Sequence, residues 1–341
     1  MINIALDAMG GDNAPGININ GAYLAAKEYN DVNITLVGQE TILIPLIKKY
    51  PDWPENKIKI QNANEIVEMA ESPSQSFRKK KNSSINVGLN LVKNKQCNGF
   101  VSAGNTGAIM TSAIFILGRI AHVERPALAA IFPSKKYPFV ILDVGSNVDC
   151  KPNQLKQFAI MGSIFAEQIL KLNKPKVGLL NIGSEKDKGN ILTQETDPLL
   201  TSLPINYIGY IEGKEITKGF ADVVVCDGFI GNTILKFGEG IVSLFKDFFK
   251  KECQSSLLAK IGLFLLKPLF KRFKKNFDYE EHGGAHLLGV NGITVIAHGS
   301  STPIAIKNAI RIAKSAAIQK MTTTIETHLE KQKEKKPQLS Q

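Results

Sequence analysis

The sequence has little of what marks several classes of protein. Its four cysteines show no CxxC or CxxH spacing, so they indicate neither a zinc site nor a disulfide framework. Aromatic residues make up only 7% of the chain and no stacking set accompanies the basic segments, which disfavours nucleic-acid binding. No secretory signal precedes the first apolar run at Ile2, and no GxGxxG motif follows it, which weakens a dehydrogenase interpretation. We therefore expect a cytoplasmic protein that needs neither a metal nor a cofactor.

What the sequence does contain is a regular alternation of short apolar runs with amphipathic segments. The runs are apolar on both faces, as strands are when helices cover both sides of a mainly parallel sheet, which predicts an α/β fold. Apolar residues at helical spacing predict helices over residues 154–172 and 303–321. The run 127–132 lies so close before the next strand that part of the sheet is open to antiparallel pairing. The other predicted strands are residues 2–8, 33–38, 57–61, 99–104, 138–145, 176–183, 205–213, 221–228 and 293–300.

Length and charge limit the domain organisation and the partners. The 341 residues, 43% of them hydrophobic, suit one α/β domain over residues 1–330, followed by a disordered basic tail, residues 331–341. The net charge of +11 favours an acidic partner, whether nucleic acid, an anionic lipid surface or a carrier protein. One basic run either meets such a carrier or is simply solvated. It consists of Arg78, Lys79, Lys80 and Lys81.

An amphipathic segment, residues 254–278, departs from the pattern of strands and helices. It is too short and too charged to span a bilayer, but its large apolar residues beside a basic cluster suit a helix pair in the headgroup interface. Pro268 should kink or divide the helix. The alternative is a helical hairpin packed in a dimer interface. The residues expected to meet the membrane are Leu263, Phe264, Leu266, Leu269, Phe270, Lys271 and Arg272.

Polar loops follow several predicted strands, at the edge where open α/β sheets bind their ligands. After the strand that reaches Val101, Gly104 and Gly107 allow close backbone approach, and the helix start that follows would turn free N–H groups toward an anion. Related loops occur at residues 143–149, 181–190 and 227–232. Each loop alone is weak evidence, because Gly, Asn and Asp also form ordinary turns and caps. The residues expected to line the cleft are Asp7, Gly10, Gly11, Asp12, Asp143, Glu185 and Asp227.

Nine motifs, in the right order between Asn3 and about Ala316, resemble those of the phosphate acyltransferase family. They are ALDAMGGD (5–12), RKKKNSSI (78–85), VSAGNTGA (101–108), ERPALA (124–129), LDVGSNVDCKP (142–152), QFAIMGS (157–163), LLNIGSEKDKGN (179–190), ADVVVCDGFIGNTILK (221–236) and GGAHLLGVNG (283–292). The resemblance implies a Rossmann-like three-layer α/β/α homodimer, related in fold to phosphotransacetylases and isopropylmalate dehydrogenases. It also implies an enzyme that transfers the acyl group of an acyl carrier protein thioester to inorganic phosphate, giving acyl phosphate and the free carrier protein, for phospholipid synthesis.

The implied reaction assigns roles to the loop residues. Phosphate is already a competent nucleophile, so the protein must bind it, aim it at the thioester carbonyl and stabilise the developing oxyanion. We expect Ser102, Gly104, Asn105 and Thr106 to bind phosphate, with Lys188 as the charge complement and Asn147 or Asn232 as donors to the carbonyl oxygen. Asp7 and Asp12 would orient Lys188 or Arg78 beside this site. Peripheral binding to the inner face of the cell membrane would bring the product to a membrane glycerol-3-phosphate acyltransferase.

Other assignments remain beside this one. Asn232 is equally well explained as a helix cap, Asp12 as a turn residue and Asp7 as a strand end. His298 is either a donor in the cleft or a structural histidine, and Cys150 has no nearby histidine in sequence to activate it as a nucleophile. A phosphotransacetylase-like enzyme that uses short acyl-CoA would need no carrier surface. A non-catalytic membrane scaffold would form no acyl phosphate with any donor.

Overall fold

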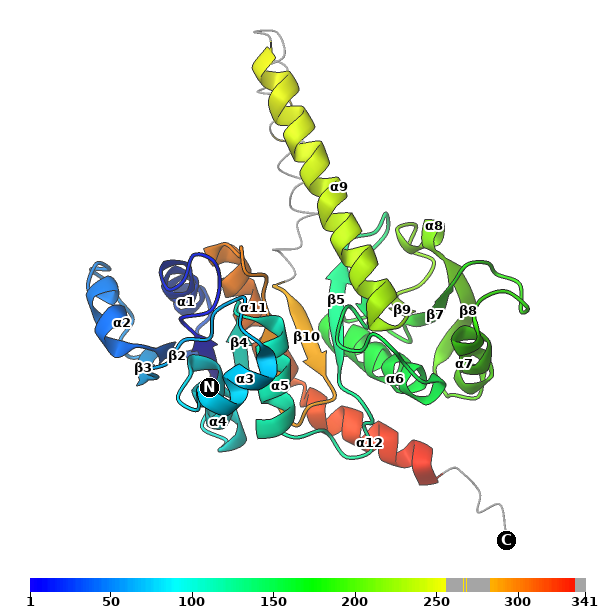
Figure 1. Cartoon of the computed structure of the whole chain (residues 1–341), viewed down its shortest axis with the longest axis horizontal. Helices are drawn as coiled ribbons and strands as arrows, with labels where there is room; N and C mark the ends of the chain where they lie inside the picture. The colour runs from blue at the N-terminus through cyan, green and yellow to red at the C-terminus, as the bar shows by residue number, and fades with distance from the viewer. Residues whose placement is uncertain (256–265, 267, 269–282, 335–341) are drawn as a thin grey trace.

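The computed structural model describes residues 1–255, 266, 268 and 283–334, and its chain is built around one large sheet (Figure 1). Of the amphipathic segment, residues 254–278, only residues 254, 255, 266 and 268 are described, and most of the predicted tail lies outside the described residues too. The elements are β1 (Ile2–Asp7), α1 (Gly16–Glu28), β2 (Val32–Gly38), α2 (Glu40–Ile47), β3 (Ile58–Asn62), α3 (Pro73–Lys79), α4 (Ser84–Lys93), β4 (Gly99–Ser102), α5 (Thr106–Ile116), β5 (Ala127–Phe132), β6 (Phe139–Leu142), α6 (Pro152–Ile169), β7 (Lys176–Asn181), α7 (Ile191–Thr201), β8 (Asn206–Glu212), α8 (Gly213–Ile216), β9 (Val223–Val225), α9 (Gly228–Ser255), β10 (Ala285–Leu288), β11 (Ile293–Ile296), α11 (Pro303–Ile318) and α12 (Met321–Glu334).

Among the described residues, the sheet has eleven strands in the order β3-β2-β1-β4-β11-β10-β5-β6-β9-β7-β8. β10 pairs antiparallel with both β11 and β5, β5 pairs antiparallel with β6, and every other pair in this order is parallel. The prediction of a mainly parallel sheet is therefore confirmed, and the 127–132 run does pair antiparallel. Pro303 opens α11, with the Thr302 side chain accepting a hydrogen bond from the Ala305 backbone, as expected for a helix start.

The three antiparallel pairs decide where the loops after the strands lie. β1, β4, β11 and β5 run in one direction, whereas β6, β7, β8 and β9 run in the opposite direction. The carboxyl ends of β1, β4 and β11 consequently lie at one edge of the sheet, and those of β6, β9 and β7 lie at the other. The polar loops expected from the sequence are thus divided between two edges.

Helices cover both faces of the sheet, which gives the three layers of the fold. One apolar core packs α1, α6, α11 and α12 against one face, with Ile19, Phe158 and Ile310 almost fully buried. A second core packs α4 and α5 against the other face through Leu89 and Ile109. Burial on both faces explains why the strands are apolar throughout and do not alternate.

The long helix α9 runs away from the body of the molecule along most of its length (Figure 1). Only its first turns contact the sheet layer, where Ile234 and Leu235 pack against the second core. Within the described residues, no helix combines the length and apolarity required to cross a bilayer.

Candidate active site

Three loops meet at the carboxyl ends of β1, β4 and β11, and we call residues 7–12, 102–106 and 297–302 the first loop group. Its loops are joined by backbone hydrogen bonds, from Asp12 N to the Gly299 oxygen at 2.8 Å and from Ala297 N to the Ser102 oxygen at 2.8 Å. Gly10 has no room for a side chain, because an added Cβ would lie 2.7 Å from Gly104 N and 2.5 Å from Asp7 Oδ2. The glycines of the DAMGGD motif therefore let its turn pack directly against the loop after β4.

Asp7 and Ser102 form a buried pair beneath this group. Ser102 Oγ donates to Asp7 Oδ2 at 2.7 Å and accepts from Gly104 N at 3.0 Å, and both side chains are almost fully buried. Burial raises the pKa of Asp7, and hydrogen bonds from Ser102 and Ser84 partly offset this. The expectation that Asp7 orients Lys188 or Arg78 is wrong, because its carboxylate is held by the serines and by Met9 N at 3.0 Å.

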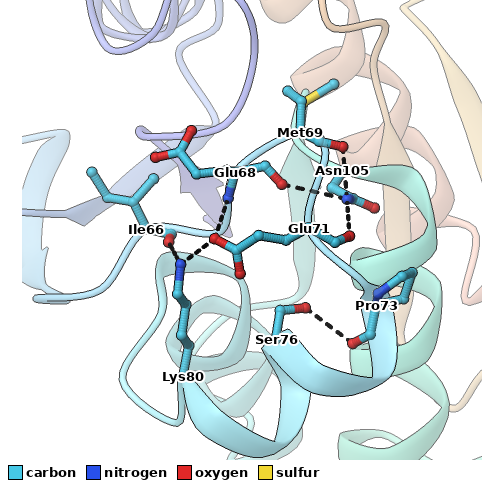
Figure 2. A network of polar contacts seen from close by, with 8 residues as sticks. All are labelled: Ile66, Glu68, Met69, Glu71, Pro73, Ser76, Lys80 and Asn105. Atoms are coloured by element: carbon cyan, nitrogen blue, oxygen red, sulfur yellow. Dashed lines mark hydrogen bonds and ion pairs between the residues drawn. The ribbon is translucent and has the colours of Figure 1, made fainter.

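Asn105 caps α5 and at the same time anchors the loop of residues 66–71 (Figure 2). Its Oδ1 accepts from Ala108 N at 3.0 Å, while its Nδ2 donates to the backbone oxygens of Met69 and Glu71, both at 2.9 Å, and of Glu68 at 3.4 Å. The side-chain amide is thus fully used within the protein. Asn105 shapes the start of α5, whereas the exposed Thr106 beside it presents its side chain to solvent.

The anchored loop also engages one lysine of the basic run. Lys80 Nζ forms an ion pair with Glu71 and donates to the Ile66 oxygen at 2.5 Å (Figure 2). The hydrogen bond that Lys80 donates to the Glu71 carboxylate is the main reason that the pKa of Glu71 is lowered. Of the four residues expected to meet a carrier protein, Lys80 is turned inward and half-buried, whereas Arg78, Lys79 and Lys81 are exposed.

His298 and Asp12 line the exposed side of the first loop group. His298 Nδ1 lies 2.8 Å from Ser300 Oγ and accepts from Ser300 N at 3.2 Å. A Cβ added to Gly299 would lie 3.0 Å from Asp12 Oδ1 and 3.0 Å from Met69 Cε, so Met69 reaches across to these two loops. The Met69 side chain is 45% exposed and adds an apolar surface beside the polar side chains of Asp12 and His298.

A second loop group, residues 143–149, 182–190 and 227–232, lies at the opposite edge of the sheet. Asp143 is fully buried at its centre and accepts five hydrogen bonds, which makes it a structural anchor for the loop. The donors are Leu128 N, Gly145 N, Ser146 N, Asn147 N and Asn147 Nδ2, at 2.7–3.2 Å. Burial raises the pKa of Asp143, and these hydrogen bonds partly offset that effect.

The start of α9 packs tightly on this loop. Gly228 N donates to the Asn147 oxygen at 2.7 Å, and a Cβ added to Gly231 would lie 1.9 Å from the Asp143 oxygen. Asp227 Oδ1 accepts from Ile230 N at 2.8 Å, so Asp227 caps the helix, whereas the Asn232 side chain is exposed beside Gly145. The capping role considered for Asn232 therefore belongs to Asp227.

The loop after β7 carries the opposite charges predicted at this edge. Glu185 and Lys188 are both exposed, and Lys188 N donates to the Glu185 oxygen at 3.1 Å in a turn that Asn181 Nδ2 supports. In the sheet order, β11, β10, β5, β6 and β9 lie between β4 and β7. Five strands of the sheet therefore separate the strand before Lys188 from the strand before residues 102–106.

The thiol considered as a nucleophile is poorly suited to that role. Burial, and then the charges of Asp143 and Asp227, raise the pKa of Cys150 to about 12. Its Sγ donates to the Asn147 oxygen at 3.6 Å. A thiol with so high a pKa is protonated at neutral pH and is a weak nucleophile.

Comparison with known proteins complements this geometry. A family model described as fatty acid synthesis protein matches residues 2–324. The chain belongs to this family. It is 45% identical over 329 residues to a phosphate acyltransferase of Clostridium novyi, which covers 96% of this chain and 99% of the relative. It is 48% identical over 317 residues to a phosphate acyltransferase of Geotalea daltonii, which covers 93% of this chain and 91% of the relative.

Solved structures show the same fold as this family member. A phosphotransacetylase from Streptococcus pyogenes superposes with a TM-score of 0.63 at 18% identity, covering 93% of this chain and 94% of the other. A branched-chain phosphotransacylase from Enterococcus faecalis gives 0.57 at 13% identity, covering 93% and 99%. The expected Rossmann-like α/β fold, with its relation to phosphotransacetylases, is confirmed. On the evidence of its close relatives, this family member is an acyltransferase enzyme.

Three residues that organise the site in this acyltransferase were missed from the sequence. Asn18 Nδ2 donates to the Ala8 oxygen at 3.0 Å and to the Gly10 oxygen at 2.9 Å, which holds the first turn. Glu71 holds Lys80, and Ser84 lies against Asp7. Of the three, only Ser84 had a signal in the sequence, because a pair of serines is typical of a helix start. In the structure its neighbour Ser83 is the cap of α4 and accepts a hydrogen bond from Asn86 N.

Proposed function

We propose that the enzyme transfers an acyl group from acyl carrier protein to inorganic phosphate. The observation that carries the proposal is identity of 45–48% over nearly the whole chain to proteins named phosphate acyltransferase. The phosphotransacylase fold is consistent with an acyl transfer in which phosphate takes part. In the reaction, a phosphate oxygen forms a bond to the thioester carbonyl carbon, the C–S bond breaks, and the carrier leaves as its thiolate.

The first loop group is the proposed phosphate site. The start of α5 supplies backbone N–H groups and the exposed Thr106 hydroxyl, which together suit a small anion. Ser102, Gly104 and Asn105 act by shaping this turn, and the exposed His298 is a further donor at its side. These assignments explain why so many buried hydrogen bonds converge on a short loop.

The second loop group is proposed to act on the acyl donor. Lys188 and Asn232 are exposed and able to bind polar groups of the acyl donor away from the reacting carbonyl, while Asn147 uses its amide to hold the loop. Exposed apolar side chains border this group, namely Val148, Ile182 and Phe229, which are 62%, 80% and 64% exposed. They favour a long acyl chain over a short one.

The proposal extends to where the product goes. A homodimer at the cytoplasmic face of the cell membrane would release the reactive acyl phosphate beside a membrane glycerol-3-phosphate acyltransferase, for phospholipid synthesis. Of the residues proposed to meet the membrane, Leu266 is described, whereas the others, Leu263 and Phe264 foremost, lie outside the described part of the chain. Co-sedimentation of the Leu263→Glu, Phe264→Glu variant with anionic vesicles tests this, since undiminished binding would contradict it.

The purified protein, incubated with acyl carrier protein thioester and phosphate, is expected to form acyl phosphate, measured by trapping with hydroxylamine. Cys150→Ala is expected to keep most of the activity, because phosphate attacks the thioester directly. The second candidate, a short acyl-CoA transacylase, is favoured by the fold shared with a phosphotransacetylase, so acetyl-CoA is assayed in parallel. Activity with acetyl-CoA alone would contradict the proposal in favour of the short acyl-CoA transacylase. Absence of product with every donor would favour the non-catalytic membrane scaffold.

A further inference from the structure

An aromatic pair on α3 and α5 stands on the surface beside the basic run. The rings of Phe77 and Phe115 stack with their centroids 5.0 Å apart and an interplanar angle of 18°. Phe115 is 67% exposed, although it ends a helix whose other face is deeply buried. So large an exposed ring on a polar surface is typical of a contact site.

One cation contacts this pair, and two more follow Phe77 on α3. Lys81 Nζ lies 4.3 Å from the centroid of the Phe77 ring, in cation–π geometry. Arg78 and Lys79 are exposed on the last turn of α3, and neither forms an ion pair within the described part of the chain. Glu71, the nearby carboxylate that would otherwise neutralise the patch, is taken by the inward Lys80. The surface therefore combines aromatic area with three positive charges, none of which forms an ion pair within the described part of the chain.

The two helices that carry the patch also reach the proposed phosphate site. A Cβ added to Gly107 would lie 2.6 Å from Pro73 Cγ, so α3 begins in close contact with the first turn of α5. Phe115 follows Thr106 by nine residues, which places it about 14 Å along the helix axis from the start of α5. Figure 1 shows α3 and α5 side by side. α5 therefore runs from the patch to the proposed phosphate site, so the acyl-bearing arm of a partner bound on the patch could lie along this helix and reach that site.

We propose that Phe77, Phe115, Arg78, Lys79 and Lys81 form the surface on which an acidic carrier protein docks. The inference rests on the proposed function and adds the location of the partner. Charge complementarity decides the occupant, because a second copy of this chain carries a net charge of +11 and would be repelled by the same three cations. The aromatic pair supplies the apolar centre and the cations supply the rim, while Lys80 belongs to the scaffold beneath.

The test compares a charge reversal on the patch with a matched one elsewhere. The patch variant is Arg78→Glu, Lys79→Glu, Lys81→Glu, and the control is Lys49→Glu, Lys59→Glu, Lys218→Glu, three exposed lysines outside α3 and α5. Calorimetric titration with holo acyl carrier protein is expected to show affinity lowered at least tenfold for the patch variant only. KM for acyl carrier protein thioester should rise in parallel, whereas turnover of an acyl-pantetheine, which lacks the carrier, should be unchanged.

Added salt should shrink the difference, because exposed charges are screened. Unchanged affinity of the patch variant would overturn the inference, as would an equal loss with acyl-pantetheine, which would indicate structural damage. Loss of vesicle binding with carrier affinity retained would reassign the patch to a membrane. A Phe115→Ala variant, which keeps all charges, should also weaken carrier binding. If wild-type protein binds the carrier but turns over no donor, the proposed function fails while the docking surface stands.

Discussion

Asn105 performs two tasks with one side chain, and both concern the geometry of the first loop group. The carboxamide oxygen caps α5, and the nitrogen holds a loop some thirty-five residues earlier in the chain through three backbone oxygens. Serine is as good a cap as asparagine but is too short to reach those oxygens. Substitution can therefore separate the cap from the anchor.

We expect Asn105→Ala to lower both stability and turnover, and Asn105→Ser to lower chiefly turnover. Loss of the cap costs about 0.5–2 kcal/mol in the alanine variant. Loss of the anchored geometry should reduce the rate of acyl transfer roughly a hundredfold in both, the effect of misplacing a reacting group by about 1 Å. Denaturation midpoints and steady-state rates measure the two effects. Full activity of the serine variant would show that the anchor has no part in catalysis.

At the scale of the element, α9 is notable for how its first turn meets the sheet. Gly228 and Gly231 lie against the backbone of residues 143–147, closer than any side chain permits. Further along the same helix, Gly238 and Gly240 have open space around them. Glycine is thus required at the base of α9 by contact, whereas farther out it only weakens the helix.

Gly231→Ala and Gly238→Ala should consequently have opposite effects on stability. The first forces the Asp143 carbonyl to move and should destabilise the protein by at least about 1–3 kcal/mol, with loss of acyl transfer. The second should stabilise it by about 0.5–1 kcal/mol, because alanine is the better helix former. Thermal unfolding of the two variants, with activity measured alongside, makes the comparison. A tolerated Gly231→Ala would mean that the loop adjusts freely.

The whole molecule leaves one long helix without a described neighbour along its outer face. Phe237, Ile241 and Leu244 recur at intervals of four and three residues, the spacing of a seam between two helices. They are 70%, 37% and 64% exposed, and Val242 and Phe245 widen the apolar face. An apolar stripe of this kind suits burial against a second copy of the chain.

We therefore expect the protein to be a dimer and the Ile241→Glu, Leu244→Glu variant to be a monomer. Two charges placed in an apolar seam cannot be paired there, so the association should weaken by orders of magnitude. Ser243→Glu, between the two positions but on the polar side, is the control and should remain dimeric. Sedimentation velocity reports the outcome for all three proteins. A dimeric double variant would place the interface on another surface.

The sequence by itself determined what depends on neighbours along the chain. Strands such as 2–8 and 293–300, the helix start at Pro303, and the order of the polar loops follow from local pattern and turn chemistry, and the family was recognisable from its motifs. Only the tertiary structure decided which loops meet. Asp7 pairs with Ser102 across 95 residues, Lys80 turns inward to Glu71, and five strands lie between β4 and β7, the strand before Lys188. The physical reason is that the apolar pattern of a strand indicates that both of its faces are buried, but not which strand it pairs with or in which direction it runs. The long-range contacts depend on that pairing and that direction.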